Sequence, residues 1–490
     1  MKLFAEVGYR YQDFVVMNWN EMKVVILGAA RQGISLARYL SSNGAEVCLN
    51  DHRQSSEFQA AQEELNQLVA SHGYPPVEWV CGGHPLELLD GADLVCVSGG
   101  VPLDLPIVAE ARQRGIPLTN DSQIFLETAP CRIIGITGSA GKTTTTSLVG
   151  RIAEAALHLE GTPAGFNRVW VGGNIGTPLI TVVDEMNPDD LAVMELSSFQ
   201  LEIMTRSPQI AAVLNITPNH LDRHRTMQAY TAAKTRILSY QHSQDNAVLN
   251  RDDPGSWGLA GEVRGELISF GAQVPAWKAH PGRGAYLRQE SIYLGDGEGE
   301  TYVLDRTDIR LRGEHNLQNV LAACAIAAAA GIPVEAMRLG VQGFSGVPHR
   351  LEYVRTWGGA DWYNDSIATA PERAMAAIRS FDEPLVLLAG GRDKDLPWED
   401  FARLVCQRVD HLILFGEAGG KIEKAIHQVC LSAPRCTLSR YSSMGQAVLA
   451  AATIVEPEDV VLLSPGGTSF DEFHDFEERG ECFKKLVMQL

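Results

Sequence analysis

The sequence predicts an α/β protein of three domains, and three observations lead to this fold class. The chain has 490 residues, and because single hydrophobic cores stop growing beyond about 250–300 residues, it is expected to divide into domains. Apolar residues make up 45% and charged residues 21% of the composition, as in globular proteins. Short apolar strands alternate with helical segments, which is typical of mainly parallel sheets covered by helices.

The predicted elements follow one another in a regular order from residue 24 onward. A helix over 33–43 joins the first two strands. Breaks at 119–131 and at 344–348, the second of them after an Ala-rich helix over 317–330, are interpreted as domain boundaries. Strands are expected at 24–28, 46–51, 93–97, 133–136, 191–196, 211–216, 246–249, 351–355, 385–389, 411–415 and 459–463. The predicted parts are an N-terminal extension, 1–21, and three domains, 22–128, 129–346 and 347–490.

Charge and composition exclude several classes of function. A formal net charge of -19 argues against sequence-independent binding of nucleic acid. No apolar stretch reaches the length of about 20 residues that spans a bilayer, and residues 1–21 do not resemble a secretory signal. The nine cysteines are scattered, without zinc-ligand spacing, which favours a reducing compartment. We expect a cytoplasmic, monomeric protein without membrane insertion.

The segment GITGSAGKTT, residues 135–144, predicts a phosphate-binding loop between a buried strand and a helix. Its glycines let the backbone N–H groups of Gly138, Ser139, Ala140 and Gly141 turn toward phosphate oxygens. Lys142 is expected to reach the β and γ phosphates, and the hydroxyl of Thr143 or Thr144 to help hold Mg²⁺. Gly135 lies one residue too far away for the usual spacing, so a plain glycine-rich turn is the alternative. The loop indicates an enzyme that consumes ATP.

A second glycine motif, Gly28 to Gly33, is followed by Asp51 at the end of the next strand. The pattern is similar to a dinucleotide-binding turn, but Ala30 stands where the backbone would have to approach a pyrophosphate closely. An ordinary tight turn of an α/β unit explains the motif equally well.

Four dispersed polar residues are candidates for chemistry: Asn174, Glu195, His220 and Lys234. Glu195 ends a strand that otherwise reads as buried, and a buried carboxylate needs a partner such as a metal ion. Oxygen ligands with one histidine suit Mg²⁺ or Mn²⁺ better than zinc. Taken singly, His220 is equally compatible with a loop histidine and Lys234 with a solvated helix residue.

In this order along the chain, these segments resemble the Mur ligase family of ATP-dependent amide ligases. The resemblance covers residues 22–490 and is carried by GITGSAGKTT, GGNIG, MELSSFQLE, NITPNHLDRH, YTAAKTRI, LRGEHNLQN, VPHRLE, NDSIAT, LAGGRDKD and LSPGGTSFDEFHDFEERG. It implies a Rossmann-like UDP-binding domain, a central ATPase domain with the phosphate-binding loop, and a Rossmann-like C-terminal domain for the amino acid. It also implies a cytoplasmic step of peptidoglycan synthesis, in which ATP activates UDP-N-acetylmuramoyl-L-alanine as an acyl phosphate and D-glutamate is added.

The resemblance further implies a role for each matching residue. The catalytic positions are Lys142, Asn174, Glu195, His220 and Lys234. Two Mg²⁺ ions would be held by Thr143, Glu195, His220 and a Lys234 carbamylated by CO2. Further ATP contacts would come from Asn316, Asn319, Arg350 and Asp365. The UDP substrate would meet Arg31, Gln32, Asp51, His52 and Asn174, and the amino acid Thr369, Lys394, Ser469 and Phe476.

Two departures from the family pattern lie beside the expected amino-acid pocket. Ile367 stands where the family usually has lysine, and Gly466-Gly467-Thr468 replaces Ala-Cys-Ala. L-glutamate as the substrate therefore stays an alternative, as does a regulatory protein that binds nucleotide without turnover.

Other classes fit the sequence less well. The diaminopimelate-adding ligases carry a D-N-P-R motif that is absent here. Folylpolyglutamate synthase lacks the N-terminal domain, and an NAD-dependent dehydrogenase would leave the loop at 138–144 unexplained. We also expect the domains to close on binding, with Arg350 and Asp365 brought to ATP.

Overall fold

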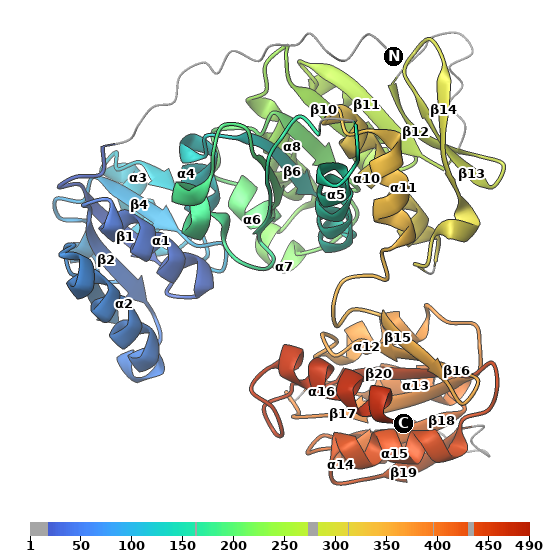
Figure 1. The fold of residues 1–490 in the computed structure, drawn as a ribbon. Helices are drawn as coiled ribbons and strands as arrows, with labels where there is room; N and C mark the ends of the chain where they lie inside the picture. Colours follow the sequence, from blue (N-terminus) through green and yellow to red (C-terminus); the bar gives the residue numbers. More distant parts are fainter. Residues whose placement is uncertain (1–17, 162–163, 273–282, 312, 395, 430–435) are drawn as a thin grey trace. The chain divides into compact units, whose positions relative to one another are not determined.

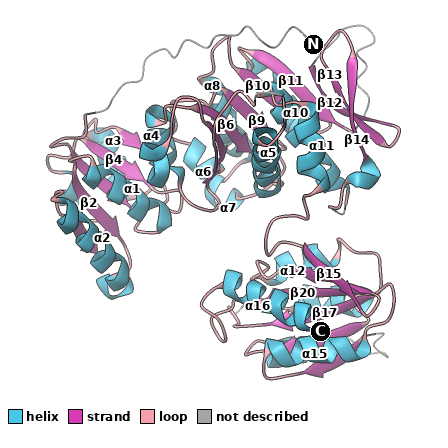
Figure 2. Ribbon diagram, in the orientation of Figure 1, coloured by secondary structure: helices cyan, strands magenta, loops and turns pink. Residues whose placement is uncertain are grey.

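The computed structural model describes residues 18–161, 164–272, 283–311, 313–394, 396–429 and 436–490. These residues form three sheets in two compact units (Figure 1). The first unit runs to Phe344, apart from a short stretch at 311–313, and holds the first two sheets; the third sheet lies in the second unit. Helices and strands alternate through all three (Figure 2). The predicted α/β class is confirmed, and the boundaries at 128/129 and 346/347 stay a prediction.

The first sheet is entirely parallel, in the order β3-β2-β1-β4-β5. The order changes direction between β1 and β4, and in open α/β sheets ligands bind outside the carboxyl ends of strands at such a point. Trp19, before the first strand, is buried against this domain. The elements are β1 (Lys23–Leu27), α1 (Arg31–Ser42), β2 (Glu46–Asp51), α2 (Gln59–His72), β3 (Glu78–Cys81), β4 (Leu94–Val97), α3 (Pro106–Gln113), β5 (Leu118–Thr119) and α4 (Asp121–Thr128).

The second sheet has nine strands in the order β14-β13-β12-β11-β10-β9-β6-β8-β7. It is parallel from β7 to β12, and β13 and β14 then run antiparallel as hairpins at its edge. The strands are β6 (Arg132–Thr137), β7 (Val169–Gly173), β8 (Leu191–Glu195), β9 (Ile210–Val213), β10 (Asn246–Asn250), β11 (Glu266–Gly271), β12 (Arg283–Arg288), β13 (Ser291–Gly295) and β14 (Glu300–Asp305).

Two groups of helices pack with the second sheet. The long helices α5 (Lys142–Leu157), α10 (Glu314–Ala329) and α11 (Val334–Gln342) contact one another. Helix α8 (Met227–Ser239) packs with β6, β9 and the short α6 (Ser198–Leu201). The turn that precedes α8 carries α7 (Leu221–His224), and α9 (Pro254–Trp257) follows β10. Because β7, β8, β6 and β9 are adjacent parallel strands, their carboxyl ends lie at one edge of the sheet, where the candidate site lies.

The third sheet has the order β15-β16-β20-β17-β18-β19 and is parallel apart from the β15–β16 hairpin. Alternate residues of β17 enter two separate apolar clusters, one with α12 to α14 and one with α15 and α16, so both faces are buried. The elements are β15 (Glu352–Trp357), β16 (Ala360–Asn364), α12 (Pro371–Ile378), β17 (Leu385–Gly390), α13 (Glu399–Arg408), β18 (His411–Phe415), α14 (Gly419–Val429), β19 (Thr437–Arg440), α15 (Met444–Ile454), β20 (Val460–Gly466) and α16 (Phe476–Gln489).

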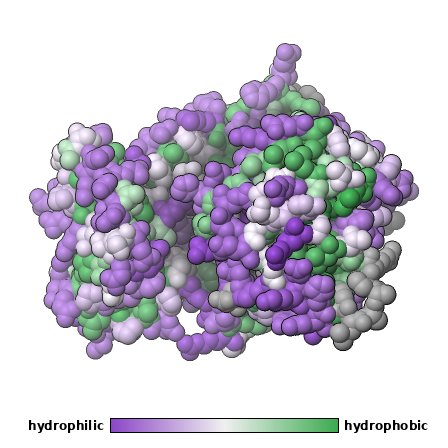
Figure 3. All heavy atoms as spheres, turned by 90° about the horizontal axis from the view of Figure 1, so that it is seen from below, coloured by the Kyte–Doolittle hydropathy of each residue, from purple (hydrophilic) through white to green (hydrophobic). Residues whose placement is uncertain are grey.

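Hydrophilic side chains predominate on the face shown in Figure 3, with hydrophobic residues scattered among them. Among the described residues, no helix has the length and apolar character that crossing a membrane requires.

Candidate active site

The phosphate-binding loop connects the end of β6 to the start of α5. Gly141 has φ 81°, and a Cβ atom placed on it would lie 2.2 Å from Asn319 Oδ1. Glycine is therefore required there both for conformation and for space. The N–H groups of Ser139 and Ala140 donate to the carbonyl and the side-chain oxygen of Asn215, at 3.0 and 2.8 Å. These two donors tie the loop to the segment after β9. The phosphate contacts expected of the loop stay a prediction.

Two lysines converge on this loop. Lys142 Nζ donates to the Gly138 carbonyl at 3.0 Å, and Lys234 Nζ donates to the same carbonyl at 2.9 Å. The carbonyl of Gly138 thus brings together two lysine side chains that lie far apart in the sequence.

Glu195 lies at the centre of the site, at the end of β8, with 1% of its surface exposed. Its Oε2 accepts a hydrogen bond from Thr143 Oγ1 at 2.9 Å, and its Oε1 accepts one from Asn174 Nδ2 at 2.8 Å. The Asn174 backbone N–H also donates to the Glu195 carbonyl at 2.9 Å. Three residues that were predicted separately are therefore in contact, because β6, β8 and β7 are adjacent parallel strands.

Lys234 projects from α8 and is 1% exposed. Its Nζ also lies 3.3 Å from Thr137 Oγ1, and 4.8 Å from the centre of the Tyr230 ring. Burial, with a further contribution from the Lys142 ammonium, lowers the pKa of Lys234 to about 6, although Glu195 opposes the shift. The side chain is therefore mainly a neutral amine at neutral pH.

This neutral amine gives a prediction about stability and pH. The unfolded chain holds a proton on Lys234 up to its ordinary pKa, whereas the folded chain releases it near pH 6. Between these values the unfolded state binds more protons, so raising the pH stabilises the fold. Lys234→Met removes this dependence. We expect the methionine variant to be more stable than wild type near pH 6.5. The difference in their free energies of unfolding should shrink by up to about 1.4 kcal/mol for each unit that the pH rises. Denaturant unfolding from about pH 6.5 to pH 9 measures this difference. A difference that stays constant with pH would contradict the buried neutral amine.

His220 is presented by the loop between β9 and α7. Its φ is 52°, in the left-handed region, and its ring meets the Phe199 ring edge-on at 5.0 Å. Partial desolvation and the Lys142 ammonium lower its pKa, which favours the neutral imidazole that binds metals.

The oxygen donors near the loop suit Mg²⁺. The described residues contain no group of three or more His, Cys, Asp and Glu side chains arranged around a metal position. Mg²⁺ is usually bound by one or two carboxylates together with substrate phosphates and water. The contact between Glu195 and Thr143, next to the phosphate-binding loop, fits this mode.

The residues expected to meet the UDP part of a substrate lie at the end of the first sheet. Arg31 begins α1 and is exposed, and its guanidinium NH2 lies 3.5 Å from the Asn174 carbonyl. Gln32 follows it and is half-buried. The start of α1 therefore lies beside the group around Glu195.

Asp51 and His52 differ in their surroundings. Asp51 is buried, and its carboxylate accepts hydrogen bonds from the Ala29 N–H and from Arg53. Burial raises its pKa, but the bonds from Arg53 and Ala29 outweigh this effect and hold the pKa below its ordinary value. The side chain of His52 is 75% exposed. Asp51 thus organises the turn before α1, and His52 is the member of the pair that faces solvent.

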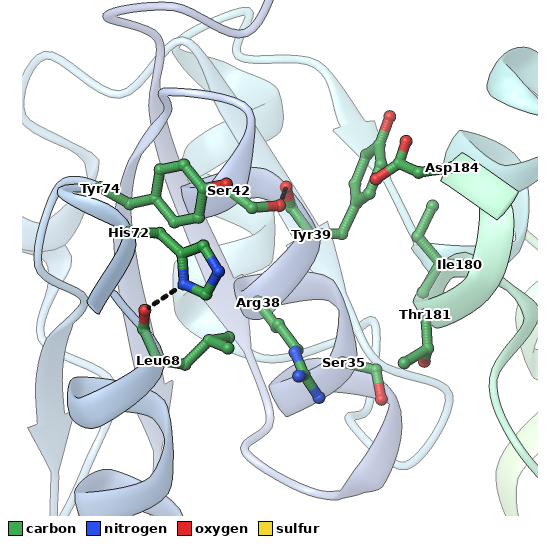
Figure 4. A pocket seen from close by; sticks show the side chains of 10 residues that line it. All are labelled: Ser35, Arg38, Tyr39, Ser42, Leu68, His72, Tyr74, Ile180, Thr181 and Asp184. Carbon is green, nitrogen blue, oxygen red and sulfur yellow. Dashed lines mark hydrogen bonds between the residues drawn. The ribbon is translucent and has the colours of Figure 1, made fainter. Parts of the chain in front are cut away.

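A cavity of about 180 Å³ lies further along α1, against α2 and the 3-10 helix Leu179–Glu185 (Figure 4). The stacked rings of His72 and Tyr74, with centres 5.3 Å apart, line one side of it. None of the predicted site residues lines it. The complete lining is Ser35, Arg38, Tyr39, Ser42, Leu68, His72, Tyr74, Ile180, Thr181 and Asp184.

In the second unit, Asp365 follows β16 and is buried. Ser464 Oγ donates to its Oδ2 at 2.8 Å, and the Leu351 N–H donates to its Oδ1 at 3.2 Å. Burial raises the pKa of Asp365 to about 7, although the Ser464 hydrogen bond opposes this effect. Arg350, on the preceding segment, also favours the carboxylate.

The residues expected to bind the amino acid lie on loops of the same unit. Thr369 follows β16, Ser469 follows β20 and is buried, and Phe476 begins α16. Lys394 is exposed. The half-buried Ile367 donates its backbone N–H to the His349 carbonyl at 3.1 Å.

Arg479 is a residue of this region that sequence reasoning missed. It is fully buried and donates to the carbonyls of Gly467 and Thr468, and to both the hydroxyl and the carbonyl of Ser366. One guanidinium therefore joins the loop that carries Ser469 to the segment that carries Ile367. A charged residue within a helical pattern gives no signal of such a role.

The Gly466-Gly467-Thr468 departure has a structural reason. Gly466 has φ 69°, and a Cβ atom on Gly467 would lie 2.5 Å from the Gly390 carbonyl oxygen. Thr468 and Arg392 exchange backbone hydrogen bonds of 2.9 and 2.7 Å. Two backbone segments pack directly on each other here, which leaves no room for a side chain at 467.

A glycine-rich loop that ends in Lys-Thr, with a buried acidic residue on an adjacent strand, is typical of enzymes that bind a nucleoside triphosphate with Mg²⁺. Comparison with known proteins defines this class further. Residues 22–120 match the MurD-like N-terminal domain of Mur ligases, 136–327 the Mur ligase middle domain, and 349–467 the Mur ligase glutamate ligase domain.

Relatives match over almost their whole length. The chain is 40% identical over 474 residues, 96% of this chain and 98% of the relative, to UDP-N-acetylmuramoylalanine--D-glutamate ligase from Symbiobacterium thermophilum. It is 37% identical over 469 residues, 96% of this chain and 97% of the relative, to the protein of the same name from Koribacter versatilis. The protein belongs to the Mur ligase family.

Solved structures show the same fold at low sequence identity. UDP-N-acetylmuramate-alanine ligase MurC from Thermotoga maritima has a TM-score of 0.52 at 18% identity, covering 96% of this chain and 100% of that one. MurF from Acinetobacter baumannii has a TM-score of 0.52 at 18% identity, covering 82% of this chain and 87% of that one.

Proposed function

We propose that this enzyme uses ATP to join D-glutamate to UDP-N-acetylmuramoyl-L-alanine, a cytoplasmic step of peptidoglycan synthesis. The names of full-length relatives at 35–40% identity support this reaction and the D enantiomer. The observation in the structure that carries the proposal is the contact of Glu195 with Thr143 and Asn174 beside the phosphate-binding loop. This contact holds a negatively charged carboxylate in a fixed position where a phosphoryl group would be transferred.

The chemistry has two steps. A carboxylate oxygen of the UDP substrate attacks the γ-phosphorus of ATP, which gives an acyl phosphate and releases ADP. The amine of glutamate then attacks the acyl carbon, the amide bond forms, and phosphate leaves with the bonding electron pair while the amine loses a proton. Both steps depend mainly on charge stabilisation and on the placement of two reactants.

We assign roles to the central residues on this basis. Lys142 would bind the phosphates of ATP, and Thr143, Glu195 and His220 would hold Mg²⁺, with Mn²⁺ as a substitute and two ions as the expected number. Bound Mg²⁺ would neutralise charge on the phosphoryl oxygens. Asn174, through its hydrogen bond to Glu195, would keep the carboxylate oriented.

Lys234 is assigned as a carbamate. Its neutral amine would add to the carbon of CO2 and lose one proton, which gives a carbamate anion that can accept hydrogen bonds and ligate Mg²⁺. Only a neutral amine can do this, and its pKa of about 6 supports the assignment.

The remaining contacts are proposed from the resemblance alone. Asn316, Asn319, Arg350 and Asp365 would contact ATP, and Arg31, Gln32 and His52 would contact the UDP part. Thr369, Lys394, Ser469 and Phe476 would bind glutamate. We propose a monomer.

The proposed function predicts which substrates must be present for the enzyme to form ADP. Purified protein with ATP and Mg²⁺ should form ADP and phosphate only when UDP-N-acetylmuramoyl-L-alanine and glutamate are both present. A coupled ADP assay with D- and L-glutamate side by side measures this, and we expect turnover with the D enantiomer. ATP consumption that ignores the UDP substrate would refute the proposed function, and a preference for L-glutamate would refute the stereochemical assignment.

A further inference from the structure

The turn that presents His220 is held in an uncommon backbone conformation. His220 has φ 52° and Arg225, which follows α7, has φ 63°. Residues other than glycine adopt this region only where surrounding contacts fix it. The contacts made by the residues between them therefore determine where the His220 side chain lies.

Arg223 provides contacts between this turn and the first domain. Its NH1 group donates to the carbonyls of Gly99 and Gly100, both at 3.2 Å, and its NH2 group donates to the Val101 carbonyl at 3.0 Å. A guanidinium is a rigid fork of five N–H donors and can hold three carbonyls at once. The loop 98–101 after β4 is thus bound by one side chain of the second domain.

The other side of the 98–101 loop supports the turn before α1. Ser98 Oγ donates to the Gly28 carbonyl at 3.1 Å. A Cβ atom on Gly28 would lie 2.8 Å from Val101 Cγ2. The loop therefore rests directly on the turn that leads to Arg31, so a displacement of the loop would displace the turn.

Phe199 completes the connection to His220. The guanidinium carbon of Arg223 lies 4.2 Å from the centre of its ring. The same ring meets His220 at 5.0 Å and stacks on the buried His224 at 5.2 Å with an interplanar angle of 4°. Arg223 therefore contacts both the ring that packs against His220 and the loop that supports the UDP-side turn.

The geometry points to Arg223 as a positioning residue that couples the UDP-binding turn of the first domain to the loop that carries His220. This inference rests on the proposed function and adds a residue to it. Arg223 is half-buried, so water can reach the three carbonyls when the guanidinium is absent, and folding should lose little. Its loss should instead appear in the binding of the UDP substrate and in the rate of turnover.

The test compares Arg223→Ala and Arg223→Lys with a matched control. Asp104→Asn removes the charge from the exposed 2.8 Å ion pair between Asp104 and Arg225, which lies beside these two segments and does not involve the Arg223 fork. KM for each substrate, kcat and the melting temperature are measured for all variants. The Kd of UDP-N-acetylmuramoyl-L-alanine is measured by calorimetry without ATP.

We expect Arg223→Ala to raise the KM and Kd of the UDP substrate about tenfold and to lower kcat, while the KM of ATP changes less than about twofold. Arg223→Lys should fall between alanine and wild type, because an ammonium cannot reproduce the fork. Added guanidinium ion, at concentrations that do not unfold the protein, should partly restore Arg223→Ala. Asp104→Asn should behave as wild type.

Unchanged UDP-substrate affinity in Arg223→Ala would overturn the inference. A second pattern would also overturn it: binding of ATP and of the UDP substrate weakens equally, the melting temperature falls, and guanidinium ion restores nothing. A purely structural role of Arg223 predicts that pattern. The wild-type assay separates this result from failure of the proposed function. If wild type shows no turnover, the proposed function fails, and the Kd comparison still tests Arg223.

Discussion

Glu195→Gln is expected to lower kcat about a thousandfold, the scale of losing a preorganised charged group in an active site. Glutamine keeps the size of the side chain but removes its charge. It also places an N–H donor against either Thr143 or Asn174, which donate to the two oxygens of Glu195. The measurement is ADP release at saturating substrates over a series of Mg²⁺ concentrations, and the variant should need more Mg²⁺.

Glu154→Gln is the control for this change. Glu154 lies on α5, away from the phosphate-binding loop, and is exposed. We expect the control to stay within about threefold of wild type, as surface changes away from a site usually do. A Glu195→Gln enzyme with near wild-type kcat would contradict the central role of this carboxylate.

Lys234→Ala is expected to abolish activity, and short carboxylic acids such as formate or acetate should restore part of it. Alanine leaves a space beside Thr137 and Gly138, where the lysine amine lies. A small carboxylate in that space can supply the negative charge that the carbamate would carry. Turnover is measured against the concentration of added acid.

Lys142→Ala serves as the contrasting variant. Lys142 contacts the same Gly138 carbonyl but is proposed to act as a cation. Its loss should be equally severe, and no carboxylate should restore it. Full activity of Lys234→Ala, or equal rescue of both variants, would show that the carbamate assignment is wrong.

Many of the parallel strands could be predicted because they are short apolar runs buried on both faces. Shorter or more polar parallel strands, such as β3, β7 and β19, could not, and neither could the antiparallel edge of the second sheet. Strands β12 to β14 have runs of only three apolar residues and begin or end in polar residues such as Arg288 and Glu300, so they give a weaker signal. The strand expected at 211–216 ends at Val213, because the following residues bond to the phosphate-binding loop.

The sequence could indicate Thr143 from its glycine-rich loop and Glu195 from its place at the end of a buried strand, whereas the role of Asn174 came from the family resemblance. It could not predict the contacts of Arg223 and Arg479. Most of their hydrogen-bond partners are backbone carbonyls from distant segments, and a carbonyl leaves no trace in the sequence. Nor could it show that the Asp51 carboxylate accepts hydrogen bonds from the Arg53 side chain and the Ala29 N–H.

The close packing of Gly467 on Gly390 also limits how this protein can diverge from its relatives. A side chain at 467 would collide with the carbonyls of Gly390 and Arg392. A side chain at 467 therefore needs a matching displacement of 390–392. Substitutions in 390–392 and in 466–468 are therefore expected to occur together. A loop exchanged between family members should include both segments to remain functional.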